Sequence, residues 1–349
     1  MALSGIKSSQ RVDGGGVLCQ NEPAPLIGSE SRQAMKTSLT LYLHFPCFDG
    51  LVSAVLASEY LERKLGWKAE CLKPVGYGLM DTWLRTSLEK PAAVVDFLFH
   101  PDADFWADHH TTSFSSEEIR ENVLRKRNEL FLYDPKSLSC SSLLWRRLGK
   151  DIRDPRFREM VSWADRIDGA RYPSVRNAVL GNSPAMRISF SLITDSSDEY
   201  CNFLVRSLRK HNLAEVASTR RVRDLYSEVR SGIRNGLRDF KKSAHVERGG
   251  IVVYDIENNG ASIVSRYAPY YFYPEARYSI GVSRSSQGSK ITAMRNPWKR
   301  VGPIHLGQVF KNHGGGGHRR VASLLVANSR QQELPTLVRT LLDAIQPES

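Results

Sequence analysis

Histidine and aspartate side chains recur in this sequence at the ends of short apolar runs. His44 lies at the end of one such run, Asp96 lies inside another, and Asp108, His109 and His110 end a third. Burying an unpaired carboxylate is costly, so the position of Asp96 among apolar neighbours indicates a functional role for this acid. Carboxylates and imidazoles that converge on one crevice form a site for divalent metal ions.

Three further aspartates extend this set. Asp49 follows His44 across a turn, and Asp165 and Asp168 lie three residues apart in an expected helix. Either of the last two alone would more often be a solvated helix position, and the whole set favours a ligand role. So many ligands fit two ions about 3.5–4 Å apart, a pair that activates water and neutralises charge on a phosphoryl group.

Four consecutive glycines at 314–317 form a second pattern. Such a backbone can approach a ligand closely, and its N–H groups can form a cradle for an anion. We expect a helix to begin within 319–325, whose N-terminus would add to the cradle. Arg295, at the end of an expected strand, would reach the same anion with a fork of donors. A flexible linker is the alternative interpretation.

The elements that would position these residues alternate in type. Short apolar or β-rich runs predict strands at 38–45, 69–74, 91–98 and 105–110. Apolar spacing predicts helices at 51–62, 80–88, 116–130, 138–149 and 155–167. The alternation predicts an α/β domain with a mostly parallel sheet and flanking helices over 38–195. Ligands of such a sheet bind outside the carboxyl ends of its strands, where the acids and histidines lie.

The rest of the chain divides into three parts. Residues 1–37 lack an apolar period and predict a disordered tail. Residues 196–245 interleave charged and apolar side chains without proline and predict a helical linker. From 246 to 345, strand patterns at 251–254, 277–282 and 290–295 predict a smaller α+β domain.

Composition narrows the class of protein. Of 349 residues, 41% are hydrophobic and 25% charged, which excludes a wholly disordered chain. No long apolar run or secretory signal is visible, so we expect no membrane partner. The five scattered cysteines form no CxxC pair and favour a reducing cytoplasm. A net charge of +12 favours polyanionic partners, which are nucleic acid, phosphorylated metabolites or an anionic membrane. The oligomeric state stays open, with a homodimer among the alternatives.

These motifs, in this order, resemble subfamily 1 of the DHH phosphoesterase superfamily. The resemblance spans about 38–330 and includes relatives such as nano-RNases and RecJ-type exonucleases. It implies a DHH domain that holds two Mn²⁺ or Mg²⁺ ions and an associated C-terminal domain that binds substrate. The matching motifs are 44–50, Asp96, Asp108-His109-His110, Asp165 or Asp168, and 314–318.

The resemblance also implies roles for single residues. One ion would be held by His44 and Asp96, and the other by Asp49, Asp96, His109 and Asp165, with Asp168 as the alternative to Asp165. His110 would face the scissile phosphate, and Asp108 would orient the neighbouring histidine. The terminal phosphate or sugar of the substrate would be held by Gly315, Gly316, Gly317, His318 and Arg295.

Cys47 departs from the pattern of the superfamily, because many members carry an acid at this position. As a thiolate ligand it would favour Zn²⁺ or Fe²⁺ over Mn²⁺. It is otherwise a packed, unligated thiol.

The predicted function is metal-dependent hydrolysis of phosphodiester or phosphomonoester bonds in short single-stranded oligonucleotides or nucleotides. A catalytically weak nucleic-acid or nucleotide-binding protein is the alternative from another class. A polyphosphate or pyrophosphate hydrolase is disfavoured by the glycine motif. An accessory protein similar to tRNA synthetases would leave the acids and histidines unexplained.

Overall fold

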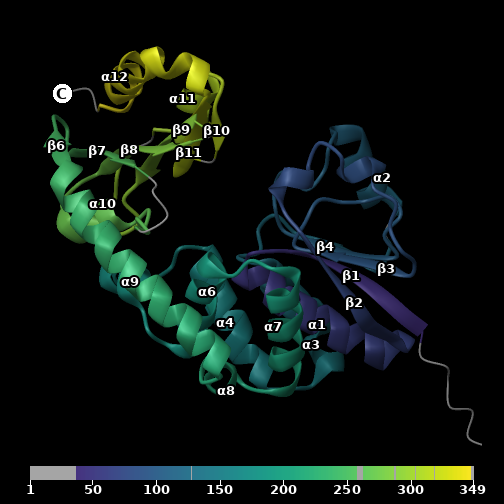
Figure 1. Cartoon of the computed structure of the whole chain (residues 1–349). Coiled ribbons are helices and arrows are strands. Elements are labelled where there is room, and N and C mark those ends of the chain that lie inside the picture. The colour runs from purple at the N-terminus through teal and green to yellow at the C-terminus, as the bar shows by residue number, and fades with distance from the viewer. Residues whose placement is uncertain are drawn as a thin grey trace, which may run out of the picture. The chain divides into compact units, whose positions relative to one another are not determined.

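The computed structural model describes residues 37–126, 128–257, 262–286, 288–302, 304–317 and 319–346 (Figure 1). Of the predicted tail, only Thr37 lies among these residues, as the first residue of a strand. In the part of the chain that is described, none of the helices has the length and apolar character needed to span a membrane.

The N-terminal part of the described chain, called the first domain below, is built on a five-stranded sheet. β1 (Thr37–His44) lies between β2 (Trp67–Val75) and β3 (Ala92–Val95), and β4 (Phe105–Asp108) and β5 (Phe131–Tyr133) follow at the far edge. All four strand pairings are parallel, which confirms the predicted architecture. The carboxyl ends of the strands therefore meet at one edge of the sheet.

Both faces of this sheet are buried, as parallel sheets require. Leu41 and Leu43 face a core that they share with helix α1 (Phe48–Leu65). Tyr42 and Trp106 face the opposite core, which Trp83 also enters. The near-continuous apolar runs of the strands follow from this burial on two sides.

Helices cover the first face of the sheet in a layer around α1 (Figure 1). Beside α1 pack α3 (Cys140–Ile152), α4 (Arg156–Asp168) and α7 (Asp198–Lys210), and α8 (Leu213–Ala217) packs beside α7. Both α7 and α8, which begin the expected helical linker, contribute side chains to this core. On the second face, α2 (Glu117–Lys126) packs Ile119 and Val123 against the other core.

The predicted α-helix over 80–88 is wrong. Two single 3-10 turns, Tyr77–Leu79 and Trp83–Arg85, lie in this part of the chain instead. Trp83 is 1% exposed, and its Nε1 donates a hydrogen bond to the Leu98 carbonyl oxygen at 3.0 Å. Packing of this one large side chain, rather than a helical repeat, fixes the segment.

A 24-residue helix, α9 (Arg220–Ser243), leads into the second domain. It packs against α6 (Pro184–Thr194) and against β7 (Ile251–Glu257). A shared apolar cluster joins α9 to α5 (Val175–Leu180) and α10 (Ala268–Phe272).

The second domain contains a six-stranded sheet in the order β10-β11-β9-β8-β7-β6. Its further strands are β6 (His245–Glu247), β8 (Tyr278–Ser285), β9 (Gly288–Arg295), β10 (Gly316–Gly317) and β11 (Val321–Val326). Only the β7–β8 pairing is parallel among those described. α11 (Leu306–Lys311) and α12 (Leu334–Ile345) pack on one core of this sheet, and the 3-10 segment Asn328–Glu333 precedes α12. The predicted α+β class is confirmed.

The helix expected to begin within 319–325 is wrong, because this segment forms β11. Its Ala322, Leu324 and Val326 are buried, whereas Leu325 is 75% exposed. This alternation has the period of two that belongs to a strand with one face on a core. The glycines therefore precede a strand and have no helix N-terminus behind them.

Candidate metal centre

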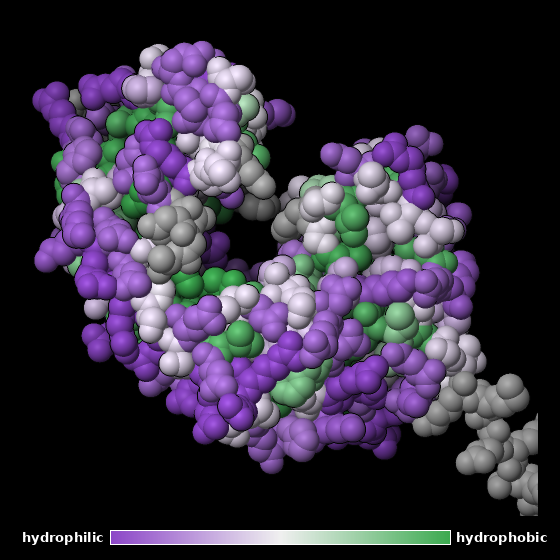
Figure 2. Space-filling view, in the orientation of Figure 1, coloured by the Kyte–Doolittle hydropathy of each residue, from purple (hydrophilic) through white to green (hydrophobic). Residues whose placement is uncertain are grey.

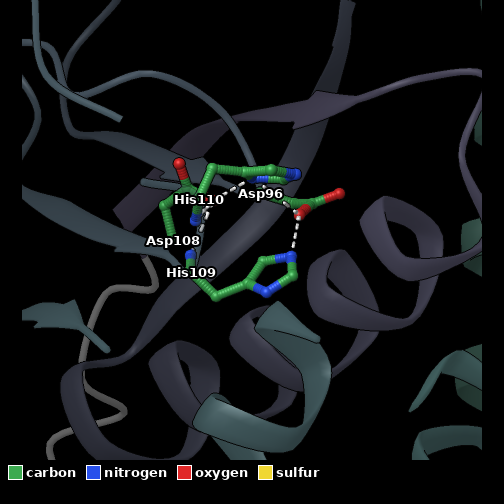
Figure 3. A group of neighbouring side chains, drawn as sticks. All are labelled: Asp96, Asp108, His109 and His110. Carbon is green, nitrogen blue, oxygen red and sulfur yellow. Dashed lines mark hydrogen bonds and ion pairs between the residues drawn. The ribbon is translucent and has the colours of Figure 1, made fainter. Parts of the chain in front are cut away.

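The acids and histidines of the first domain meet at the carboxyl edge of the parallel sheet, as predicted. His44 is the last residue of β1, Asp96 follows β3, and Asp108 ends β4 with His109 and His110 directly after it. Figure 3 shows the His109 and His110 side chains directed toward Asp96. We refer to the set His44, Cys47, Asp49, Asp96, Asp108, His109, His110 and Asp168 as the Asp/His cluster.

Asp49 enters the cluster from the first turn of α1. Its carboxylate accepts hydrogen bonds from the backbone N–H groups of Cys140 at 2.7 Å and Ser141 at 2.9 Å. The Ser141 hydroxyl donates to the same carboxylate. Asp49 thus joins α1 to the N-terminus of α3, where free N–H groups favour an anion.

Gly50 lets α1 begin this close to β1. A Cβ at this position would overlap the carbonyl oxygen of His44 and lie 3.4 Å from Oδ2 of Asp96. The glycine in the sequence 44–50 therefore brings the first turn of α1, with Asp49, against the end of β1.

Asp96 lies at the centre of the cluster. Its backbone has φ of 57°, a left-handed conformation that is uncommon for a residue with a side chain and is often found at functional sites. The residue is 2% exposed, and Oδ2 lies 3.3 Å from Nδ1 of His44. Oδ1 has no hydrogen-bond partner in the described structure.

His109 presents its second nitrogen to three carboxylates. Nδ1 lies 3.2 Å from the Ser137 carbonyl oxygen, which can only accept a hydrogen bond, so Nδ1 carries a proton. Nε2 is buried, has no hydrogen-bond partner among the described residues, and lies 3.6–3.7 Å from oxygens of Asp49, Asp96 and Asp168. A neutral ring would direct a lone pair at these oxygens, an arrangement that a cation between them would stabilise.

Asp108 holds the turn that carries the two histidines. Its Oδ1 accepts from the backbone N–H of His109 and from Nδ1 of His110, both at 2.8 Å. Its Oδ2 accepts from the Ser113 hydroxyl at 2.5 Å. These contacts fit the orienting role expected for Asp108 and fix the proton of His110 on Nδ1.

The end of α4 brings Asp168, rather than Asp165, to the cluster. Oδ2 of Asp168 lies 3.6 Å from Nε2 of His109, and the side chain is 31% exposed. Asp165 instead accepts a hydrogen bond from the Ser139 hydroxyl at 2.6 Å. Ser139 is the N-cap of α3, so Asp165 supports the helix end that holds Asp49.

Cys47 lies at the N-cap position of α1 and offers its thiol to the same site. Its Sγ, a nitrogen of His44 and an oxygen of Asp96 all lie within 4.8 Å of one another. Burial, and then the charges of Asp96, Asp49 and Asp168, raise the pKa of the thiol well above its usual range.

The crowding of acids changes the ionisation of the cluster. Burial first, and then the charges of Asp49 and Asp108, raise the pKa of Asp96 well above its usual range. Burial and the charge of Asp49 raise the pKa of Asp168 to about 6. Burial and the charge of His110 lower the pKa of His44 to about 4. The two raised values reflect negative charge that the surrounding protein does not balance and that divalent cations would balance. The lowered value keeps the His44 ring neutral, the form that binds a metal ion.

Two separate ligand groups, and a third that overlaps both, follow from these positions. One contains His44, Cys47 and Asp96, and the other contains Asp49, His109 and Asp168. Asp96 also belongs to a group with Asp108, His109 and His110, so it is common to the neighbourhood of both. Two ligand atoms that share one ion at about 2.1 Å lie about 3 Å apart at a right angle, so gaps of 3.6–3.7 Å can close around an ion.

An adjoining cavity of about 550 Å³ is lined by His44, Cys47, Asp168 and Arg266, among others. Arg266 is exposed, and its guanidinium lies 5.0 Å from the ring centre of Tyr267. Its charge opposes the rise in the pKa of Asp168, which places it within electrostatic reach of the cluster. Sequence reasoning missed Arg266, because an arginine far away in the chain carries no local signal.

The backbone and hydroxyl partners of the cluster were also missed. They are Ser113, Ser137, Ser139, Cys140 and Ser141. A signal did exist for Ser139, since serine directly before the first helical residue is a preferred N-cap. The others contribute through contacts that only the fold creates.

The glycine cluster forms the edge of the second sheet. β10 pairs with β11 through Gly316 opposite Ser323 and Gly317 opposite Ala322. A Cβ at Gly315 would lie 2.6 Å from the Ser323 carbonyl oxygen, and Gly317 has φ of 144°. Glycine is therefore needed here for close backbone packing, and Gly316 is open on its free side. His318, expected to bind substrate, lies outside the described residues.

Arg295 ends β9, as predicted. Its guanidinium donates a hydrogen bond to the carbonyl oxygen of Val301. Its backbone N–H donates to the carbonyl oxygen of Arg320 at 2.9 Å.

Comparison with known proteins agrees with this architecture. No protein-family model matches the sequence, and no curated protein matches it. The chain is similar in structure to PggH, a pGpG-specific phosphodiesterase from Vibrio cholerae. That similarity has a TM-score of 0.67 at 17% identity and covers 88% of this chain and all of that one.

Two further structures are similar over most of this chain. A DHH domain described as a member of the s1p family of ribosomal proteins gives a TM-score of 0.56 at 14% identity, with 88% and 87% of the two chains covered. RecJ from Thermus thermophilus in complex with Mn²⁺ gives 0.52 at 13% identity, with 90% of this chain and 53% of RecJ covered. These likenesses show that the chain has the fold of DHH-domain proteins, which confirms the fold that the motifs implied.

Proposed function

We propose that this chain is a metal-dependent phosphoesterase that hydrolyses phosphodiester or phosphomonoester bonds in nucleotides or short single-stranded oligonucleotides. One observation carries the proposal. Oδ1 of Asp96 and Nε2 of His109 are both buried without a partner in the described structure and lie 3.7 Å apart. Phosphodiesterase and exonuclease structures with the same fold support it.

Two sets of side chains would hold the ions. His44, Cys47 and Asp96 would hold one, and Asp49, His109 and Asp168 the other, with Asp96 between them. When bound, a pair of divalent cations activates water as a nucleophile and neutralises charge on the phosphoryl group. The oxygen and nitrogen donors suit Mn²⁺ or Mg²⁺, while the thiol of Cys47 would draw the first position toward Zn²⁺ or Fe²⁺.

His110 would assist the leaving group. Burial alone would lower its pKa, but the hydrogen bond and charge of Asp108, with the charges of Asp168 and Asp49, outweigh burial and raise it. Because Asp108 accepts the Nδ1 proton, Nε2 is the nitrogen that can face the substrate. A protonated His110 can then donate to the departing oxygen.

Arg266 would bind the substrate beside the ions. It shares the cavity with His44 and Asp168, and a guanidinium there can hold two phosphate oxygens at once. In the second domain, Gly315, Gly316 and Gly317 with His318 and Arg295 would hold the far end of a short substrate. A grip of this kind places the next phosphate over the ions.

The experiment is hydrolysis of a substrate panel with Mn²⁺, Mg²⁺, Zn²⁺ or chelator. The panel contains 5′-phosphorylated di- and trinucleotides, a 20-mer, adenosine 3′,5′-bisphosphate and polyphosphate. We expect metal-dependent release of mononucleotides from the short substrates, lost in Asp96→Asn and His109→Ala. Matched controls are Asp224→Asn and His211→Ala, which change exposed residues of the same types.

The outcomes separate the alternatives. Turnover of polyphosphate alone would show that the substrate is polyphosphate and not a nucleotide or an oligonucleotide. Binding of the 20-mer without turnover in any metal would support the catalytically weak binding protein. Equal turnover by wild type and Asp96→Asn would refute the proposed centre.

Arg266 has its own readout in the same assay. We expect Arg266→Gln to raise KM for the dinucleotide about tenfold or more, since a charge-assisted pair contributes about 1.5–3 kcal/mol. The Mn²⁺ affinity of the variant should stay within twofold of wild type. A normal KM with weakened Mn²⁺ binding would instead show that Arg266 stabilises the Asp/His cluster and does not bind the substrate.

A further inference from the structure

The exposed side of α9 carries a basic face that the proposed chemistry does not use. At about 100° per residue, its members fall within about 80° of the helix circumference. Three acids, Asp224, Glu228 and Asp239, fall in the adjoining sector. The basic face consists of Arg220, Arg223, Arg230, Arg234, Arg238 and Lys241, all exposed.

This face is long and continuous. From Arg223 to Lys241 the helix advances 18 residues, or about 27 Å. The opposite side of α9 is buried, with Tyr226, Ile233 and Phe240 among its apolar residues. Hydrophilic residues cover much of the region of Figure 2 in which Figure 1 draws α9.

Positive charge also gathers around Tyr226, a buried residue of α9 next to the basic face. The guanidinium carbon of Arg187, from α6, lies 5.9 Å from the Tyr226 ring centre, and that of Arg230 lies 5.7 Å from it. Burial raises the pKa of Tyr226, and the charges of Arg230, Arg187 and Arg234 oppose that rise. Several like charges around one ring repel one another unless an anion lies among them.

In the part of the chain that the structure describes, most of these arginines have no carboxylate beside them. Among the described residues, acidic side chains within 4.0 Å are found for Arg220, which meets Asp224 at 3.4 Å, but not for Arg187, Arg223, Arg230 or Arg234. A hollow of about 500 Å³ lies over Arg234 and Arg238 with Ser231. The basic face thus offers unneutralised donors along a groove-like surface.

We propose that the basic face of α9 binds the phosphate backbone of single-stranded nucleic acid. A face about 27 Å long extends beyond a di- or trinucleotide, so the surface suits a strand longer than the proposed substrates. A membrane helix would need an apolar face directed outward, whereas no large apolar side chain on α9 is exposed among the described residues. The surface would retain strands whose short fragments are the substrates of the metal centre.

The test measures binding without hydrolysis. Full-length protein is titrated into a 5′-fluorescein-labelled 12-mer oligouridylate in EDTA, at 50–200 mM KCl, and followed by anisotropy. The variant Arg223→Gln/Arg230→Gln/Arg234→Gln removes three charges from the basic face. The control Arg125→Gln/Arg158→Gln/Arg339→Gln removes three exposed charges from α2, α4 and α12.

We expect the slope of log K against log[salt] to become less negative by about 2 in the α9 variant, at about 0.7 per lost phosphate contact. Its affinity at 50 mM KCl should fall about tenfold, while the control stays within twofold of wild type. Equal losses in the two variants would overturn the proposal, and so would failure of the wild type to bind the 12-mer. If the α9 variant lost binding to phosphatidylserine vesicles but kept wild-type binding to the 12-mer, the partner of the basic face would be a membrane and not nucleic acid. Since EDTA removes any metal, these outcomes do not depend on whether the chain is a hydrolase.

Discussion

Replacing Asp96 by asparagine should stabilise the metal-free protein and abolish its response to metal. Asp96 is 2% exposed, its Oδ1 lacks a partner in the described structure, and Asp49, Asp108 and Asp168 surround it. Its pKa is raised in the fold, so the ionised carboxylate favours the unfolded chain at pH 7.5. Relief of an unsatisfied buried charge contributes about 1–3 kcal/mol.

The expected change in melting temperature follows from this energy. At about 2.1 cal/mol/K per residue, the entropy of unfolding of 349 residues is about 0.7 kcal/mol/K, so a gain of about 2 kcal/mol raises Tm by about 3 °C in EDTA. Wild type should gain about 2.7 kcal/mol when Mn²⁺ is at 100 times its Kd. The asparagine side chain offers no anionic ligand, so the variant should gain little. The difference in Tm between the two proteins that is seen in EDTA would therefore become smaller or change sign in Mn²⁺.

Thermal denaturation of wild type, Asp96→Asn and the surface control Asp224→Asn measures this directly, in EDTA and in a Mn²⁺ series. A lower Tm for Asp96→Asn in EDTA would refute the reasoning. It would mean that Asp96 is satisfied by the protein itself and needs no cation. A Mn²⁺ response of wild-type size in the variant would exclude Asp96 as a ligand.

Four further predictions concern neighbouring residues. In calorimetric titrations, Asp168→Asn should lose most of its Mn²⁺ affinity, whereas Asp165→Asn should keep that affinity and lose about 1 kcal/mol of stability with its Ser139 contact. In EDTA, the pKa of Asp168 is higher in the folded protein, at about 6, than in the unfolded chain, so wild type loses stability as pH rises from about 4 to about 6. In urea melts, the stability advantage of Asp168→Asn over wild type should grow over that range and then level off. Gly50→Ala should cost about 3 kcal/mol in chemical denaturation, because its Cβ overlaps the His44 carbonyl, and an unchanged midpoint would contradict this packing. Cd²⁺ should produce an ultraviolet thiolate charge-transfer band that Cys47→Ser abolishes, and a band retained in that variant would show that Cys47 is not a ligand.

The sequence contains enough to predict which polar residues meet in this fold. His44, Asp96 and Asp108 each follow an apolar run, and parallel strands bring such positions to one edge. The choice between Asp165 and Asp168 was harder to make, because both lie on one side of the last turn of α4. Only the position of Ser139, set by the packing of α3, directs Asp165 away from the Asp/His cluster.

The two wrong helix predictions have local causes. Residues 80–88 contain helix-compatible side chains, but the buried ring of Trp83 holds two short turns instead. Residues 319–325 contain arginine, alanine and leucine, which favour helices, while the alternation from Val321 onward belongs to a strand. In both segments tertiary packing outweighed propensity.

Asp49 explains why the fold and the candidate site cannot be separated. The same carboxylate accepts two backbone hydrogen bonds from the start of α3 and lies 3.7 Å from Nε2 of His109. A site built this way is held in place by the core, because α1 and α3 cannot separate without moving a ligand. It also concentrates negative charge inside the core, since Asp96 and Asp168 lie around the same nitrogen. The protein without metal therefore carries an internal repulsion that cations would remove, and metal binding should both stabilise the fold and assemble the site.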